Sequence, residues 1–274
     1  MKHIRVAAQL HPQHGDYPNT RRAVLRAEEL GYNIAYTWDH FFPLYGEGEE
    51  HLECWSLLAG WAEATHTIEL GSLVACNSYR NPNLLADIAR SVDRIAGGRV
   101  ILGVGSGWNR QDYDEYGYEF GTAGSRLAAL GAALPVITSR LERLSPPPVR
   151  KMPILIAGSG PRVTTRLVAR YADAWHAGFP EHPSELTTAI EALEHWCAEI
   201  GRDPASIEWS VGVEPYDLDR FLDSDADQYV RLGFTQFTLG FNGPAWSVDA
   251  GRRWLEWRDR QNAAREAELA PVPD

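Results

Sequence analysis

The sequence predicts an α/β protein, folded as a single-domain (β/α)₈ barrel of the TIM type over residues 1–274. Eight strand-like apolar runs alternate with helical segments, and this alternation favours a parallel sheet with helical crossovers. No stretch of the chain looks like a linker between domains, and eight such units in about 250 residues are typical of a closed barrel. A doubly wound open sheet is the alternative.

Short apolar runs that end in glycine or polar residues define the strands. Val100, Ile101, Leu102 and Val104, for example, form a run that suits a strand buried on both faces. The sixth of these runs is very short. The expected strands cover residues 4–10, 33–38, 68–76, 99–105, 152–157, 172–176, 207–213 and 234–239.

Capping residues, prolines and glycines indicate where the helices begin and end. Asn19 or Thr20 is placed to cap the first helix, which Gly31 ends, and Pro82 suits the first turn of the third helix. Residues 106–123 are expected to form a loop, and the tail 270–274 is expected to fray. The expected helices cover residues 20–30, 51–64, 82–95, 125–144, 184–200, 219–232 and 247–268, and a further helix follows Gly158-Ser159-Gly160-Pro161 and ends at Tyr171.

Composition and charge indicate which kinds of binding partner and which cellular compartment to expect. A net charge of −11 argues against nucleic acid or an anionic membrane as a partner, although a small anionic ligand remains compatible with it. Cys54, Cys76 and Cys197 have no CxxC or Cys/His spacing, so we expect reduced thiols and neither disulfides nor zinc. The chain starts without a signal-like segment and has no apolar run of membrane-spanning length, which favours a cytoplasmic location.

Polar residues and glycines gather where the predicted strands end, and that is the edge at which barrels of this class bind ligands. Two glycine turns, at 105–107 and 158–160, each lead towards a helix. Backbone N–H groups in such turns can bind a phosphate, although glycines that serve only to make tight turns are the simpler interpretation.

Asp39 and His40, at the end of the second predicted strand, are the strongest candidates for chemistry. A histidine there can exchange a proton near neutral pH, and the adjacent carboxylate can fix a ligand. Alternatively, Asp39 caps the following loop and His40 packs on aromatic rings. His11, His14 and His176 also lie near strand ends, but no spacing among the histidines supports a metal site, so none is expected.

Several stretches resemble the bacterial luciferase-like family of flavin and deazaflavin oxidoreductases. Their order and spacing over roughly residues 1–215 are more specific than any one of them. Within that family the sequence is most similar to the branch that uses coenzyme F-420, an 8-hydroxy-5-deazaflavin, with FMN as the alternative. The similar stretches are Tyr-Thr-Trp-Asp-His-Phe at 36–41, Tyr-Arg-Asn-Pro at 79–82, and residues 98–109, 153–161 and 171–175.

The resemblance implies a flavin-type ring bound in the barrel mouth, with Asp39 near the ring and His40 near the site of hydride transfer. It also implies a bulge at Leu73-Val74-Ala75 behind the ring, where the family often has a non-prolyl cis peptide, and a phosphate held by residues 158–160. The expected cofactor contacts are Asp39, Leu73, Val74, Ala75, Asn77, Gly105, Ser106, Gly107, Trp108, Asn109, Ala157, Gly158, Ser159, Gly160 and Pro161. The expected substrate pocket consists of Gln9, His11, Trp38, Trp175 and His176.

The function expected from this resemblance is a coenzyme F-420-dependent oxidoreductase that moves a hydride between the deazaflavin and a small organic substrate. An FMN-dependent monooxygenase fed by a separate reductase is the alternative. A non-catalytic flavin-binding barrel and a metal hydrolase barrel are further hypotheses. Trp108 stands where deazaflavin-dependent sugar-phosphate dehydrogenases carry a glutamate, which argues against sugar-phosphate oxidation. The family also implies a homodimer.

Overall fold

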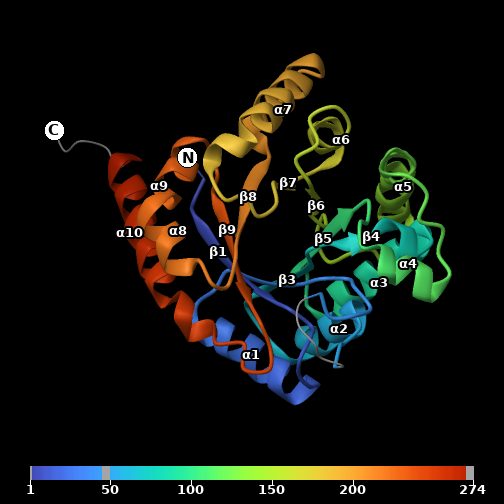
Figure 1. Cartoon of the computed structure of the whole chain (residues 1–274), viewed down its shortest axis with the longest axis horizontal. Helices are drawn as coiled ribbons and strands as arrows, with labels where there is room; N and C mark the ends of the chain where they lie inside the picture. The colour runs from blue at the N-terminus through green and yellow to red at the C-terminus, as the bar shows by residue number, and fades with distance from the viewer. Residues whose placement is uncertain (1, 45–49, 270–274) are drawn as a thin grey trace.

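The protein is a closed barrel of parallel strands surrounded by helices (Figure 1). The structure is a computed structural model that describes residues 2–44 and 50–269, so the predicted fraying of residues 270–274 lies outside it. The strand order is β3-β2-β1-β9-β8-β7-β6-β5-β4, and β3 also pairs with β5, which closes the ring. The predicted barrel is therefore confirmed, and the open sheet is excluded.

The strands are short and all their pairings are parallel. The helices follow them on the outside of the barrel (Figure 1). The strands are Arg5–Leu10 (β1), Ile34–Thr37 (β2), Glu69–Ser72 (β3), Ala75–Cys76 (β4), Val100–Gly105 (β5), Ile154–Ala157 (β6), Ala174–His176 (β7), Glu208–Val213 (β8) and Gln236–Phe241 (β9). The α-helices are Tyr17–Leu30 (α1), Cys54–Ala64 (α2), Pro82–Ile95 (α3), Arg110–Tyr116 (α4), Ala123–Arg143 (α5), Thr164–Tyr171 (α6), Thr187–Glu199 (α7), Leu218–Ser224 (α8), Ala226–Arg231 (α9) and Arg252–Leu269 (α10). The 3₁₀ helices are Asn77–Tyr79 (η1), Pro183–Leu186 (η2), Pro204–Ser206 (η3) and Val248–Gly251 (η4).

The third predicted strand is interrupted. It is split into β3 and β4 by a bulge with a cis peptide between Leu73 and Val74, as the family resemblance implied. Both halves lie against β5, so the pair occupies one strand position of the barrel.

Three local expectations were wrong. Asp16 caps α1 by accepting a hydrogen bond from the Asn19 N–H at 3.0 Å, so the cap lies earlier than Asn19 or Thr20. The predicted helix 219–232 is two helices, and Asp225 at their junction accepts hydrogen bonds from Arg220 and Ser224. The predicted loop 106–123 contains α4, whose seven residues are too few to show helical periodicity in the sequence.

Alternation along the strands separates two cores. Outward residues such as Leu70, Val104 and Trp175 pack against the helices, whereas Tyr36, Ile101 and their neighbours fill the barrel interior. At the amino ends of the strands, Arg5 forms ion pairs with Glu69 and Glu208. The barrel is thus filled at its amino end, which leaves the carboxyl end for a cavity. Among residues 2–44 and 50–269, no helix is both long and apolar enough to cross a membrane.

A glycine on β5 allows the third strand position to pack closely. A Cβ atom at Gly103 would collide with the carbonyl oxygen of Ser72, the last residue of β3. The Ser72 hydroxyl in turn donates a hydrogen bond to the Gly103 carbonyl at 2.8 Å. Gly103 therefore sets how closely β5 approaches the residue before the bulge.

We predict that Gly103→Ala destabilises the protein by about 1–3 kcal/mol, because backbone must move to admit the methyl group. Gly131→Ala on α5 is the matched control. Its Cβ would make only ordinary contact with Leu167 at 3.5 Å, so this change should be neutral or stabilise by up to about 1 kcal/mol. Urea unfolding of both variants measures the effects, and equal stabilities would contradict the account.

Candidate active site

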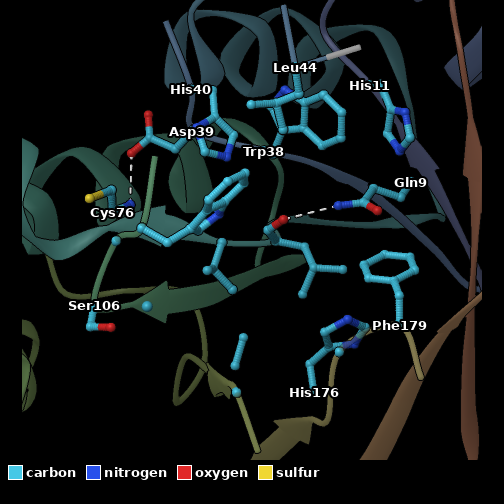
Figure 2. A pocket seen from close by; sticks show the side chains of 18 of the residues that line it. Gln9, His11, Trp38, Asp39, His40, Leu44, Cys76, Ser106, His176 and Phe179 are labelled. Carbon is cyan, nitrogen blue, oxygen red and sulfur yellow. Dashed lines mark hydrogen bonds between the residues drawn. The ribbon is translucent and has the colours of Figure 1, made fainter. Parts of the chain in front are cut away.

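A cavity of about 390 Å³ opens at the carboxyl ends of the strands. Figure 2 shows its polar side chains in two groups, with Gln9, His11 and His176 on one side and Asp39 and His40 on the other. Most of the residues expected from the sequence lie around it. Those that line it are Gln9, His11, Trp38, Asp39, His40, Leu73, Val74, Gly105, Ser106, Gly107, Trp108, Ala157, Gly158 and His176.

Trp175, which was expected in the substrate pocket, does not line the cavity, because its ring faces the helices. It is fully buried beside Trp209 and Phe234, as alternation along β7 dictates once His176 points inward. Its indole N–H donates to the Gly158 carbonyl at 2.8 Å. Trp175 therefore supports the second glycine turn from outside.

The remaining expected contacts do not line the cavity. Ala75 packs in the core between strands and helices, and Asn109 donates through Nδ2 to Asp112 at 3.0 Å. Ser159, Gly160 and Pro161 are exposed. The residues outside the cavity lining are Ala75, Asn77, Asn109, Ser159, Gly160, Pro161 and Trp175.

His40 is held by a carboxylate that sequence reasoning missed. Its Nδ1 lies 2.6 Å from Oδ2 of Asp112, which is fully buried on α4. Because an ionised carboxylate only accepts hydrogen bonds, this contact places the proton on Nδ1. Nε2 is then left to exchange a proton with a ligand. The imidazole packs edge-on against Trp38 and Trp108 at ring-centre distances of 5.9 and 5.4 Å.

Asp112 binds more than His40. It also accepts hydrogen bonds from the Phe41 N–H at 3.0 Å, the Tyr79 hydroxyl at 2.9 Å and the Asn109 amide at 3.0 Å. Burial alone would raise the pKa of Asp112, but the hydrogen bonds from His40, Phe41 and Tyr79 lower it below its ordinary value. The group is therefore anionic at neutral pH and can stabilise a protonated His40.

Asp39 has a different environment. Its carboxylate accepts hydrogen bonds from the two terminal guanidinium nitrogens of Arg80, at 2.5 and 3.0 Å, and from the Cys76 N–H at 3.0 Å. Arg80 also binds Glu53 at 2.6 Å. These contacts give Asp39 a positioning role, because it fixes the segment that follows the bulge. Its predicted contact with the cofactor ring stays a prediction.

Gln9 fixes the bulge from the other end. Its side-chain amide donates to the Leu73 carbonyl at 3.0 Å (Figure 2). This leaves Gln9 Oε1 as a buried acceptor without a partner within the described structure. Such an atom is unfavourable unless a ligand or water satisfies it. The bulge is thus held by side chains of the first and second strand ends.

Two neutral histidines lie on the same side as Gln9. Burial lowers the pKa of His11 to about 4 and the pKa of His176 to about 3. His11 contacts Asn242 Oδ1 through Nδ1 at 2.6 Å and stacks on Trp38 with ring centres 4.0 Å apart. His176 Nδ1 lies 3.0 Å from the Ser210 hydroxyl, and its buried Nε2 has no partner among the described residues. The two histidines therefore make this side of the cavity polar without adding a charge to it.

The glycine turn after β6 has one backbone N–H group already bonded within the protein. Gly158 has a φ of +120°, which favours glycine, and its N–H donates to the His176 carbonyl at 2.9 Å. Helix α6 begins at Thr164 and ends at Tyr171, the predicted end. Residues 159–163 therefore lie between the strand and the helix.

Sequence reasoning missed the site roles of Asp112, Arg80 and Phe179. Asp112 fell in the predicted loop, and Arg80 stood in a similar stretch without an assigned role. Phe179 lines the cavity and packs over Gly212, where a side chain would clash with its ring. No pattern in the sequence indicates these contacts. Among residues 2–44 and 50–269, no group of three or more His, Cys, Asp or Glu side chains could hold a metal ion.

A family model described as luciferase-like monooxygenase matches residues 2–220. The chain belongs to this family. The luciferase-like family predicted from the sequence is therefore confirmed.

Named relatives carry different activities. A phthiodiolone/phenolphthiodiolone dimycocerosates ketoreductase of Mycobacterium tuberculosis is 30% identical over 217 residues, which are 73% of this chain and 56% of the relative. The chain thus spans a little over half the length of these curated relatives. A pyrimidine monooxygenase RutA of Methylorubrum populi is 26% identical over 89% of this chain and 66% of the relative.

Solved structures share the fold at low sequence identity. An F-420-dependent secondary alcohol dehydrogenase, solved with an F-420-acetone adduct, has a TM-score of 0.79 at 17% identity and covers 92% of this chain and 98% of its own. A monooxygenase of Streptomyces bottropensis has a TM-score of 0.70 at 16% identity over 91% of this chain and 96% of its own.

We predict that Asp112→Asn lowers the free energy of unfolding by about 2–4 kcal/mol at pH 7, because four donors lose an anionic acceptor. The folded-state pKa of Asp112 lies below its ordinary value near 4, so its stabilisation is complete above that value and is lost as pH falls through the folded-state pKa. The deficit of the variant should therefore shrink in acid.

Urea unfolding at a series of pH values measures this difference. Asp114→Asn, on the same helix with a side chain 63% exposed, is the matched control and should have little effect at any pH. A deficit that grows in acid, or none at pH 7, would show that Asp112 does not act as an anionic acceptor.

Proposed function

We propose that the chain is a coenzyme F-420-dependent oxidoreductase that transfers a hydride between the deazaflavin and a small organic substrate. The observation that carries the proposal is the His40–Asp112 pair, which presents an imidazole to a cavity bordered by the Leu73-Val74 bulge. The named relatives support it, since one group is called ketoreductases and one structural neighbour is called an F-420-dependent alcohol dehydrogenase.

The residues present fit a flat ring with polar edges. Leu73 and Val74 form one apolar surface, and Gly105 leaves room there, because a Cβ atom on it would lie 2.7 Å from Val74 Cγ2. The unpartnered atoms Gln9 Oε1 and His176 Nε2 require hydrogen-bonding partners, which a ring edge or a substrate can supply. Within the predicted turn 158–160, the backbone N–H groups of Ser159 and Gly160 would hold the phosphate, because the Gly158 N–H already donates to the His176 carbonyl.

When bound, the deazaflavin supplies or accepts the hydride at its central ring carbon. His40 would exchange the accompanying proton at Nε2, while Asp112 holds its Nδ1–H and stabilises the charged imidazole. Trp38 and Trp108 pack edge-on against His40, whose side chain is 13% exposed, and Trp108 itself is 63% exposed at the mouth.

The side of the cavity formed by Gln9, His11 and His176 would face the substrate. With His11 and His176 neutral, it suits an uncharged substrate with a hydroxyl or carbonyl group better than an anionic one. The expected partner is therefore a small neutral molecule. The homodimer and the cytoplasmic location expected from the sequence stay predictions.

An FMN-dependent monooxygenase served by a separate reductase is the second candidate. It is favoured by the similarity to a pyrimidine monooxygenase, which extends over 89% of the chain. Titration of the purified protein with coenzyme F-420 and with FMN separates the two candidates. Preferred binding of F-420 is the expected result, and tight binding of FMN alone would overturn the proposal.

His40→Ala should lower the turnover number about 10²- to 10⁴-fold, as expected for the loss of a general acid or base. The affinity for F-420 should remain close to that of the wild type. Stopped-flow measurement of hydride transfer, alongside a cofactor titration, tests both statements. His66→Ala, at an exposed histidine, is the control. Full turnover by the His40 variant with the cofactor bound would remove His40 from the mechanism.

A further inference from the structure

Three arginines extend from the second glycine turn along one side of α6. Arg162 follows the turn, and Arg166 and Arg170 lie four residues apart on the helix, so they share one face. At a rise of 1.5 Å per residue the step between them is about 6 Å. All three are exposed. In Figure 1, α6 stands beside α7 in the ring of helices.

These arginines do not pair with carboxylates. Within the described part of the chain, none of the three makes an ion pair, whereas arginines such as Arg26, Arg220 and Arg253 do. The protein as a whole carries a charge of −11. The side of α6 is therefore a local concentration of unpaired positive charge on an acidic protein, in direct continuation of the predicted phosphate site.

Aromatic contacts hold two of the three in place. The Arg166 guanidinium lies over the Trp196 ring at 5.4 Å, and Arg170 lies near the Tyr171 ring at 5.6 Å. Trp196, on α7, donates its indole N–H to the Pro161 carbonyl at 3.1 Å. The stacked Arg166 is thus tied to the glycine turn itself.

Stabilisation of the helix does not explain this arrangement. Arg162 and Arg166 flank the amino end of α6, where the helix dipole is itself positive, so cations are unfavourable there. A bound anion would offset both the dipole and the arginine charges. This favours a ligand role for at least the first two arginines.

We propose that Arg162, Arg166 and Arg170 bind an extended chain of carboxylates that continues from the cofactor phosphate. Coenzyme F-420 has this chemistry, because its phosphate is followed by a lactyl group and a chain of glutamates, whereas FMN ends at the phosphate. The inference rests on the proposed function and deepens it, since it assigns the part of the protein that distinguishes the tailed cofactor from FMN.

The test compares two deazaflavin ligands by isothermal titration calorimetry. One is F-420 with several glutamates, and the other is its phospholactyl form without glutamates. Wild type should bind the tailed form about fivefold to tenfold more tightly at low salt, a size typical of a few exposed ion pairs, and the preference should fade near 500 mM salt.

Arg166→Gln/Arg170→Gln should remove most of this preference, since only Arg162 then keeps its charge, and should leave the affinity for the tailless form unchanged. Arg166→Lys/Arg170→Lys, which keeps both charges, should retain most of the preference. Arg21→Gln/Arg94→Gln removes two exposed arginines on α1 and α3 and is the control matched in charge, expected to behave as wild type.

A preference that is undiminished in the glutamine variant, or an equal loss of affinity for both ligands, would overturn this inference. So would a wild type that binds both deazaflavins equally, although the proposed function would then still stand. Binding of FMN and of neither deazaflavin would overturn both the inference and the proposed function. Thermal unfolding of each variant checks that the exposed substitutions leave the fold intact.

Discussion

One buried carboxylate determines how the His40 side of the cavity is assembled. Asp112 accepts hydrogen bonds from His40, from the backbone of Phe41, from Tyr79 and from Asn109. These donors belong to the segments that follow three successive strand positions of the barrel, so a single anion gathers them. Because a buried anion is stable only when it is fully hydrogen-bonded, the positions of these segments depend on one another. The orientation of His40 follows from this arrangement.

The Leu73-Val74 bulge depends on a second set of contacts. Gln9 holds its first carbonyl, Asp39 holds the backbone after it, and Gly103 allows β5 to pass close by. The cavity therefore has rigid walls formed by side chains of neighbouring strands. On the side formed by Gln9, His11 and His176, both histidines are neutral. That side therefore suits a ligand that contributes hydrogen bonds and no charge. Charge for an anionic ligand is provided outside the barrel, along α6.

The sequence was informative wherever a physical pattern repeats. Alternating strands and helices predicted the barrel, and the polar strand ends predicted most of the cavity lining, because the carboxyl ends of parallel strands meet at one edge. Contacts between distant segments leave no such pattern. Asp112 lies on a seven-residue helix too short to detect. Trp175, expected in the substrate pocket, faces outward, and the register of a three-residue strand cannot be judged from so few residues.

In the proposed enzyme, His40, held by Asp112, and the Leu73-Val74 bulge face the same bound deazaflavin. A crystal structure of the protein with coenzyme F-420 would show whether they do. We expect the ring to lie against Leu73 and Val74, with the Nε2 side of His40 towards its central carbon and the phosphate at residues 158–160. A ring bound elsewhere, or a His40 that keeps its bond to Asp112 but points away from the ring, would contradict it.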